Sequence, residues 1–376
     1  MAALMPQPDR SVVAVPPPGT APGTWAGAPS AACSNGDVYL AYRLRRPLGH
    51  GRGYAVAVAR SADGVRFETL LTIGKEEMDA ESLERPALVR TLDGAWRLYL
   101  SCATTGTKHW RVEVIEASSP DAFEARRSRV VLPGDAEKAV KDPVIVRHGG
   151  VWHLWASTHP LADPDQTDRM ATEYATSADG LDWTWRGTAL SPRPGEWDAR
   201  GVRVSAVRLN GGAIIAHYDG RATAAENYEE RTGVATGTEP AALTAASSVP
   251  AAQSPAGGGL RYLSVLELGD GHERWYYELT RPDGVHELRT ELRWLACARP
   301  GRAMSAWVSL ALPRPALPRP RLAGSTADHT RLAGRETVLR MRAAGRCGPG
   351  RARTAWLRPA RRSRRAAAAS RRSSRR

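Results

Sequence analysis

The sequence lacks the short motifs that mark many cofactor-dependent and serine-nucleophile enzymes. It contains no Gly-x-Gly-x-x-Gly, no phosphate-binding loop and no Gly-x-Ser-x-Gly, so dinucleotide, nucleoside triphosphate and α/β-hydrolase chemistry find no support. Its four cysteines lie far apart, without the spacing of a zinc site. We therefore expect no cofactor and no metal, although the oxygen ligands of a calcium ion would leave no readable spacing.

Signals for export and membrane insertion are also missing. Residues 1–10 have neither the basic start nor the apolar run of a signal peptide, and nowhere do 18 uncharged apolar residues follow one another. We expect a cytoplasmic protein with no membrane partner, whose cysteines are free buried thiols. A bridge between Cys33 and Cys102 is the alternative.

Charge is distributed very unevenly along the chain. The formal net charge of +14 would by itself suggest an anionic partner. However, residues 299–376 contain 21 arginines, no lysine and two acidic residues, which leaves 32 basic and 37 acidic residues in the rest of the chain. The body is therefore mildly acidic, and we expect no nucleic-acid partner for it.

The C-terminal segment 299–376 differs from the body in composition as well as charge. It is rich in Arg, Ala and Pro, and residues 361–376 are only Arg, Ala and Ser. Such a segment cannot bury enough apolar surface to offset its ordering entropy, so it is predicted to be disordered. Three interpretations remain open: an arm that binds polyanions non-specifically, a solvated tail, or an out-of-frame end of a gene rich in G and C.

The body contains a recurring hairpin. Its clearest copy is Lys141–Ser157, in which a strand of β-branched residues leads through a glycine pair into a second strand that carries Trp152 and Trp155. Arg85–Ser101 repeats this pattern almost residue for residue, and weaker copies begin near residues 34, 203 and 261. The hairpin is therefore a unit of an internal repeat.

The repeat has a nearly constant length. The turn glycines are separated by 58, 56, 62 and 59 residues; they are Gly36, Gly94, Gly150, Gly212 and Gly271. A second hairpin signal, Ser-Ala-Asp-Gly, occurs at residues 61–64 and 177–180, two repeat lengths apart. This recurrence predicts an all-β, five-bladed β-propeller with four antiparallel strands in each blade. A β-sandwich or two unrelated β domains is the alternative.

The repeat also predicts the domain boundaries. We expect an N-terminal extension over residues 1–30, the propeller over 31–298 and the disordered tail over 299–376. Within the proline-rich extension only Ser11–Val15 has strand character, and it is expected to pair with the last blade and help close the ring. The blades are expected at residues 31–73, 84–132, 141–190, 202–243 and 260–295.

Two features together resemble a known group of proteins. Asp142-Pro143 and Arg85-Pro86 precede inner hairpins, and Ser-x-Asp-Gly-x-x-aromatic hairpins lie further out. In these respects residues 30–295 resemble the propeller glycosidases, which include the arabinanase and xylosidase group of glycoside hydrolase family 43, the fructosidases and levansucrases, and the mannoside phosphorylases. The resemblance implies a sugar or glycoside substrate, bound where the first residues of the inner strands converge on the axis.

Glycoside cleavage requires a pair of carboxyl groups. The resemblance places Asp142 where these families keep an aspartate that orients the sugar and tunes the acid. It provides no counterpart for their blade-one aspartate, because the matching residues 28–30 read Ala-Pro-Ser, nor for their blade-four glutamate. Glu84, at the start of blade two, and Asp198, in a Trp-Asp pair before blade four, are the substitutes that we predict to be catalytic with Asp142.

Cations occupy the starts of four of the five inner strands. Arg85, Lys141, Arg203 and Arg261 would create a positive field suited to a carboxylate or a phosphate, and we predict that they bind substrate. Alternatively, they only neutralise neighbouring carboxylates. Further substrate-binding candidates are polar or aromatic residues near the ends of inner hairpins and on loops, namely Lys108, His109, His159, Asp219 and Trp197.

The sequence therefore predicts a glycoside hydrolase that acts through axial carboxylates on a sugar that carries an anionic group. A glycoside phosphorylase, which would use inorganic phosphate, and a non-catalytic glycan-binding propeller are the alternatives. Two carboxyl groups that face each other about 5 to 10 Å apart would favour hydrolysis. A single carboxylate among arginines would favour binding.

Overall fold

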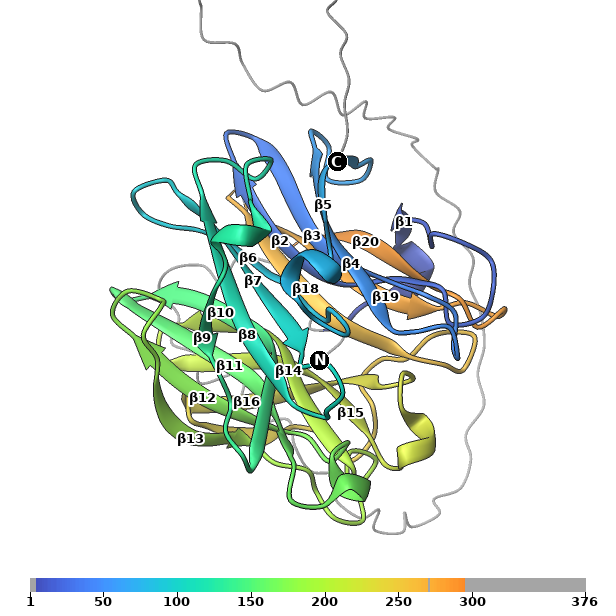
Figure 1. Ribbon diagram of the computed structural model, residues 1–376. Coiled ribbons are helices and arrows are strands. Elements are labelled where there is room, and N and C mark those ends of the chain that lie inside the picture. The colour runs from blue at the N-terminus through green and yellow to red at the C-terminus, as the bar shows by residue number, and fades with distance from the viewer. Residues whose placement is uncertain (1–4, 270, 295–376) are drawn as a thin grey trace, which may run out of the picture. The chain divides into compact units, whose positions relative to one another are not determined.

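Residues 5–269 and 271–294 are described in this computed structural model, and they form an almost purely β-structure (Figure 1). The described residues contain twenty strands and five 3-10 helices, and no α-helix. The expected tail at 299–376, together with Cys297 and Cys347, lies outside the described residues. Its predicted disorder and the three interpretations of it therefore stay predictions.

The strands pair into four sheets, which we describe as five groups of four strands numbered along the chain. Group one contains β2 (Trp25–Ser34), β3 (Asp37–Arg45), β4 (Gly53–Ser61) and β5 (Glu68–Gly74). Group two contains β6 (Ala87–Arg90), β7 (Trp96–Ala103), β8 (Trp110–Ala117) and β9 (Arg129–Leu132). Group three contains β10 (Lys138–His148), β11 (Val151–Pro160), β12 (Ala171–Ser177) and β13 (Thr184–Leu190).

The remaining elements are as follows. Group four contains β14 (Gly201–Asn210), β15 (Ala213–Arg221), β16 (Arg231–Glu239) and β17 (Ala242–Ala245). Group five contains β18 (Leu260–Leu268), β19 (His272–Thr280), β20 (His286–Trp294) and the N-terminal β1 (Val12–Val15). The 3-10 helices are η2 (Pro8–Arg10), η3 (Glu76–Met78), η4 (Ala125–Arg127), η5 (Pro164–Gln166) and η6 (Ala224–Glu226).

Neighbouring strands within each group pair antiparallel, as the hairpin signals predict. Groups two, three and four are separate four-stranded sheets. Groups one and five form one eight-stranded sheet, which is joined by a single parallel residue pair, Trp25 with His286. In β1, Val12 lies opposite Thr290 of β20. The prediction that the N-terminal strand pairs with the last group is therefore confirmed.

Group one begins earlier than the sequence predicted. The expected extension 1–30 contains all of β1 and the first six residues of β2. Trp25, at the start of β2, is buried and stacks on His286 with 4.3 Å between the ring centroids. The proline and alanine residues of β2 made its first half hard to recognise as a strand from the sequence. In the structure, the buried Trp25 holds the first residues of β2 against group five.

The strand that carries Asp142 also differs from the expectation. The Asp142-Pro143 pair was expected to begin the inner strand, whereas β10 begins at Lys138. Its register with β11 shifts between Lys141 and Val144, and Asp142 has a φ of 55°. This is a β-bulge, which accommodates a proline because the extra residue makes no ladder hydrogen bond.

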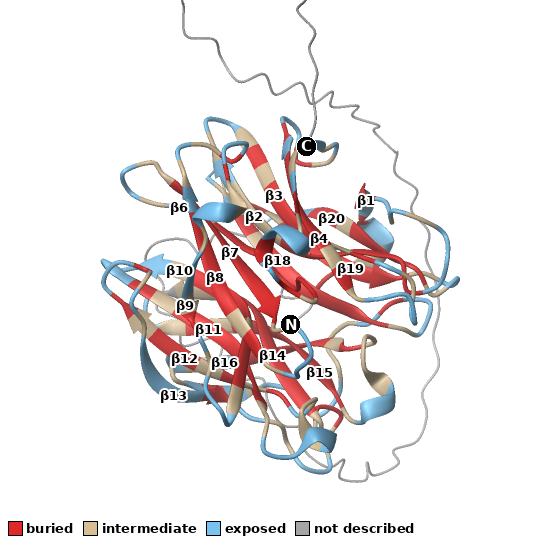
Figure 2. Ribbon diagram, in the orientation of Figure 1, coloured by how far each residue is buried: buried red, intermediate tan, exposed pale blue. Residues whose placement is uncertain are grey.

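The tryptophans of the hairpins join neighbouring groups. Trp155 of β11 packs in a cluster with Tyr218 of β15, and Trp152 packs in another with Tyr99 of β7. The Ser-Ala-Asp-Gly turns reach across the same boundaries, because the Tyr99 hydroxyl donates to the carbonyl oxygen of Gly180 over 2.7 Å. Figure 2 shows the result: burial is concentrated along the strands and exposure in the loops.

Both described cysteines are free thiols, one exposed (Cys33) and one buried (Cys102). The alternative of a bridge between them is therefore wrong. Burial raises the pKa of the Cys102 thiol, which keeps it protonated and unreactive. None of the helices among the described residues is long and apolar enough to cross a membrane.

Candidate functional site

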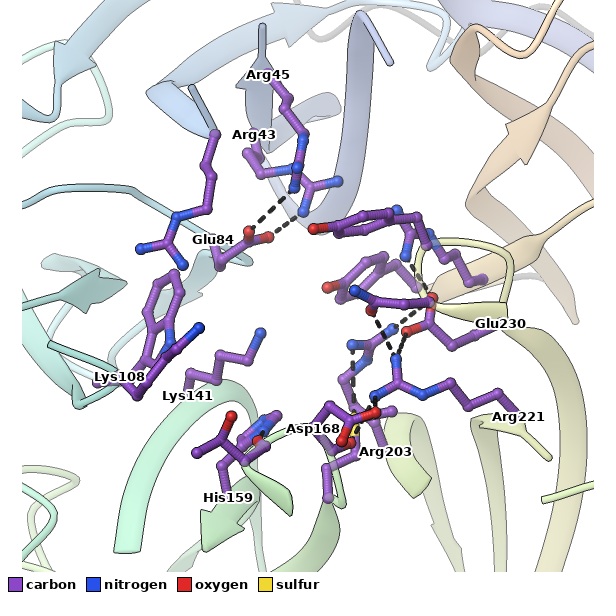
Figure 3. A pocket seen from close by; sticks show the side chains of 18 residues that line it. Arg43, Arg45, Glu84, Lys108, Lys141, His159, Asp168, Arg203, Arg221 and Glu230 are labelled. Carbon is purple, nitrogen blue, oxygen red and sulfur yellow. Dashed lines mark hydrogen bonds and ion pairs between the residues drawn. The ribbon is translucent and has the colours of Figure 1, made fainter. Parts of the chain in front are cut away.

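A cavity of about 190 Å³ lies where the first halves of the inner strands meet (Figure 3). All five groups contribute to its wall. The charged lining residues are Arg43, Arg45, Arg52, Glu84, Lys108, Lys141, Asp168, Arg203, Arg221, Glu230 and Arg261. The other lining residues are Trp110, His159, Thr167, Met170, Asn227, Tyr228 and Tyr262. Eight of the charged lining side chains are cations and three are carboxylates, and further buried carboxylates pair with some of these cations from behind the lining.

A shared backbone feature brings the inner strands to this cavity. Ala28, Asp142 and Tyr262 occupy corresponding places in β2, β10 and β18, and their φ angles are 54°, 55° and 54°. Each is the site of a register shift against the following strand. This left-handed conformation is costly for a residue other than glycine, so the surrounding structure must hold it in place. Lys141 and Arg261, which directly precede two of these bulges, both line the cavity.

Glu84 is held by cations on one side of the cavity. Its carboxylate accepts a hydrogen bond from Arg43, and Arg45 Nη1 lies 3.8 Å from Glu84 Oε1. Burial alone would raise the pKa of Glu84, but the charges of Arg43, Lys141 and Arg45 outweigh it and lower the pKa to about 2. Glu84 is therefore ionised at any ordinary pH.

Glu230 and Glu278 belong to a larger network on the opposite side. Arg221 Nη1 donates to Glu230 over 2.8 Å, and Arg261 binds both carboxylates, with its Nη2 2.6 Å from Glu278 Oε1. Arg43 Nη2 lies 2.9 Å from the other oxygen of Glu278 and so connects the two sides. Burial opposes ionisation of both carboxyl groups, but the arginines prevail and lower both pKa values.

Asp142 and Asp219 lie directly behind the lining rather than in it. Arg203 Nε donates to Asp219 Oδ2 over 3.0 Å, and Arg203 Nη1 lies 3.4 Å from Asp142 Oδ2. Lys141 Nζ is 3.6 Å from the same oxygen of Asp142. Burial raises the pKa of Asp219, against the attraction of Arg203. Both carboxylates are fully buried and act on the cavity through the cations that they hold.

His159 contributes a neutral acceptor to the wall. Its Nδ1 is 2.9 Å from the carbonyl oxygen of Thr167, which only accepts, so Nδ1 carries the proton. Nε2 is buried and has no hydrogen-bond partner among the described residues. Burial, aided by the charge of Lys141, lowers the pKa of His159 to about 3. Such a nitrogen is suited to accept a hydrogen bond from a sugar hydroxyl.

The structure gathers most of the predicted site residues. Six of them line the cavity, namely Glu84, Lys108, Lys141, His159, Arg203 and Arg261. Asp142 and Asp219 contact Arg203 from behind. The other four predicted residues, Arg85, His109, Trp197 and Asp198, are not among the lining either. Trp110 does line the cavity, but Lys141 and Arg52 lie over its ring at 4.8 and 5.3 Å.

Asp198 and Trp197 serve the packing of group four instead. Asp198 accepts a hydrogen bond from the Tyr218 hydroxyl over 2.8 Å and pairs with Arg193. The Trp197 ring stacks on Tyr218, with 5.6 Å between centroids. His109 contacts Thr104 within its own hairpin. The Trp-Asp pair of the sequence is therefore a local packing feature of this chain.

Several charged residues near the ends of second hairpin strands were not predicted from the sequence, namely Arg43, Arg45, Arg221 and Glu278. Register explains their position: Gly27 lies opposite Arg43, Arg203 opposite Asp219, and Arg261 opposite Glu278. The end of an antiparallel partner must lie beside the start of the inner strand. Arg43, Arg221 and Glu278 could have been found from this relation. Asp168, Tyr228 and Glu230 carried no comparable signal.

Comparison with known proteins finds similarity at the level of structure. No protein-family model and no curated protein sequence matches the chain. A putative glycoside hydrolase from Parabacteroides distasonis is 16% identical, with a TM-score of 0.54 over 77% of this chain and 97% of that one. The β-1,2-mannobiose phosphorylase from Listeria innocua, in complex with β-1,2-mannobiose, is 15% identical, with a TM-score of 0.55 over 73% and 90%.

A thermostable family-43 glycoside hydrolase is similar to the same degree. It is 16% identical, with a TM-score of 0.54 over 74% of this chain and 91% of that one. At such identities the similarity shows the fold alone. It excludes the β-sandwich, which the strand spacing in the sequence had left open as an alternative. The chain therefore has the β-propeller fold of the glycoside hydrolases and mannoside phosphorylases.

Proposed function

We propose that the chain is a five-bladed propeller in which each strand group is one blade. The single residue pair between Trp25 and His286 supports this division, because a continuous sheet would pair its two halves along their length. β1 then serves as the outermost strand of the last blade and closes the ring. In this arrangement the cavity of Figure 3 lies at one end of the axis.

The function that this cavity supports best is the phosphorolysis of a glycoside, with inorganic phosphate as the attacking group. The observation that carries the proposal is the charge of the wall, eight cations against three carboxylates. Arginine and lysine are the usual partners of phosphate oxygens in proteins. Buried carboxylates already pair with the buried arginines, but a neutral sugar alone would give no reason for Lys108 and Lys141, which the lining carries in addition.

Hydrolysis by a pair of carboxyl groups is less well supported. One of the two must carry a proton near neutral pH in order to donate it to the leaving oxygen. Glu84 has a pKa of about 2, and the pKa of Glu230 is also lowered. The predicted catalytic trio of Glu84, Asp142 and Asp198 does not meet in the cavity, since only Glu84 lines it. The carboxylates are placed to hold arginines in position.

Phosphorolysis does not require a protonated carboxyl group from the protein. One of the phosphate oxygens forms the new bond to the anomeric carbon as the bond from that carbon to the glycosidic oxygen breaks. The leaving oxygen takes the proton that the phosphate carries, so the products are a sugar 1-phosphate and a free alcohol or sugar. Because the nucleophile is already an anion, the step needs no general base from the protein.

The less fully paired cations indicate where phosphate would bind. Lys108 lines the cavity, and Lys141 is 3.6 Å from its nearest carboxylate oxygen. Arg45 is 3.8 Å from Glu84, and its Nε has no partner among the described residues. We assign phosphate to these cations, which Figure 3 labels, and the sugar to the part of the cavity beside His159 and Asp168. A uronate or phosphorylated sugar would use the same cations.

The proposal is tested with the full chain and a set of chromogenic glycosides, with and without inorganic phosphate. We expect release that requires phosphate and yields a sugar 1-phosphate. Lys141→Gln should raise the KM for phosphate about tenfold or more, because one charge-assisted contact is lost. Lys138→Gln is the matched control, since Lys138 precedes it on β10 but pairs with Glu173 outside the lining. Turnover at the same rate without phosphate would refute phosphorolysis.

A second function, non-catalytic glycan binding, is favoured by one observation. Every carboxylate that lines the cavity is paired with at least one arginine, so none is free to transfer protons. This function predicts that glycosides bind, as measured by calorimetry, without any turnover in either condition.

A further inference from the structure

A second cavity, of about 270 Å³, lies further along the same inner strands. Its wall is formed by residues that follow the starts of these strands, such as Ser30 of β2, Val144 of β10 and Ala206 of β14. Three residues of a strand span about 10 Å. The two cavities are therefore distinct places along the axis, and Arg203 and Tyr262 line the first but not the second.

Arg85 is the residue that makes this second cavity chemically unusual. The side chain lines it and is only 3% exposed. Its Nη2 donates to the carbonyl oxygens of Ser205 and Leu263, over 2.6 and 3.3 Å. Its Nε and Nη1 are buried and have no hydrogen-bond partner among the described residues. A buried guanidinium with unused donors is costly unless something else satisfies them.

The charge around Arg85 is not balanced from within the cavity. Burial lowers the pKa of Arg85 to about 10, despite the attraction of Asp219 and Asp142, so the cation is poorly compensated. None of the described residues that line this cavity is acidic. Two more arginines, Arg90 and Arg147, are exposed and line it as well.

The rest of the lining determines what kind of anion fits. Alanine, valine, leucine and isoleucine side chains form much of the wall, together with Pro143 and Trp152. A dianion such as phosphate would leave charge against apolar surface, whereas one carboxylate with a short alkyl chain matches both parts. The volume is several times that of one water molecule, about 30 Å³, which is enough for a few heavy atoms.

We propose that the second cavity is a binding site for a small organic monocarboxylate, whose oxygens accept hydrogen bonds from the free nitrogens of Arg85 and whose alkyl group lies against the aliphatic wall. The site is separate from the one assigned to phosphate and sugar, and it does not depend on the proposed function. Bound carboxylate would satisfy the unused donors of Arg85 and stabilise the centre of the ring.

Calorimetric titration of the full chain with propionate, at constant ionic strength, tests this site. Propionamide, which has the same shape and no charge, should not bind. Arg85→Gln should weaken propionate binding at least tenfold, because a charge-assisted hydrogen bond is lost. Arg90→Gln, at the exposed edge of the same cavity, should change it by less than threefold. Lys108→Gln, in the first cavity, should leave it unchanged.

The opposite results would overturn the site. Equal binding of propionate and propionamide, or equal binding by the wild type and Arg85→Gln, would show that the guanidinium binds no anion. If Arg85→Gln fails to fold by circular dichroism, crystals of the wild type soaked in propionate decide the question. Electron density for propionate beside Arg85 supports the proposal, and density only in the first cavity or nowhere refutes it.

Discussion

Arg203 Nη1 lies 3.4 Å from Asp142 Oδ2, although 61 residues separate them in the sequence. The carboxylate of group three is thus held by a cation of group four, which also binds Asp219. Asp142 is fully buried and does not line the cavity. Asp142 therefore contacts Arg203 directly and can influence a substrate only through that arginine.

Asp142→Asn should therefore destabilise the fold and strengthen anion binding. Loss of one partner from a buried ion pair typically costs about 3 to 5 kcal/mol of unfolding free energy. At the same time Arg203 and Lys141 lose a negative neighbour, so the affinity of the first cavity for phosphate should rise. Urea unfolding and phosphate titration measure the two effects.

Asp182→Asn is the control for this substitution, because Asp182 is exposed in a turn of the same group. It should alter neither quantity. Asp142→Asn with unchanged stability, or with weaker phosphate binding, would contradict the role of Asp142 as a partner of Arg203.

His159 should make the stability of the protein depend on pH. Its pKa is about 3 in the folded protein, below its usual 6.5. Between these values the unfolded chain binds a proton that the folded one does not, so stability is full above pH 6.5 and falls as the pH decreases toward 3. The slope from this residue is at most about 1.4 kcal/mol per pH unit.

His159→Asn keeps a donor for the Thr167 carbonyl and removes the titrating ring. Its unfolding free energy should fall less steeply between pH 6.5 and 4 than that of the wild type, as measured by urea unfolding at several pH values. His50→Asn, at an exposed residue, should follow the wild-type profile. Parallel profiles for the wild type and His159→Asn would show that the folded imidazole is protonated.

Asp198 gives a prediction of the opposite kind, in which stability changes and binding does not. Asp198 accepts from the Tyr218 hydroxyl and pairs with Arg193, away from the cavity lining. Asp198→Asn should lower the unfolding free energy by about 1 to 3 kcal/mol and leave phosphate and glycoside affinity within twofold of wild type. Asp283→Asn, in an exposed pair with Arg281, is the control for stability. Loss of ligand binding in Asp198→Asn alone would restore Asp198 to the site.

The repeat allowed much of the fold to be predicted, because its signals are local. Glycine turns and alternating hairpins mark each group, and the Ser-Ala-Asp-Gly turns mark the boundaries at which groups pack. The same pattern located Glu84, Lys141, Arg203 and Arg261, since residues at the start of an inner strand face the axis by construction. The places of these residues could therefore be predicted from short-range sequence patterns.

The remaining site residues depend on contacts between distant segments. Arg43 lines the cavity because a bulge near Ala28 sets its register with β2, and no property of residue 43 itself reveals this. Asp198 was predicted to be in the site and is not. The sequence of a Trp-Asp pair is the same whether the carboxylate faces a ligand or accepts a hydrogen bond from Tyr218, and only the packing of group four distinguishes the two arrangements.

Gly27 links these long-range contacts to a final prediction. A Cβ atom at residue 27 would lie 1.7 Å from Glu278 Oε2, the oxygen that accepts from Arg43 and from the backbone of Ala28. Gly27→Ala must therefore displace Glu278 and break its buried ion pairs, at a cost of at least about 3 kcal/mol.

Gly74→Ala is the control, because its nearest neighbours are the ends of two glutamates at 3.4 Å. Thermal unfolding should separate the variants by several degrees, and phosphate affinity should fall only in Gly27→Ala, since Glu278 orients Arg43 at the cavity. Equal melting temperatures would mean that Glu278 can leave the network freely, and the paired carboxylates would then be available for chemistry after all.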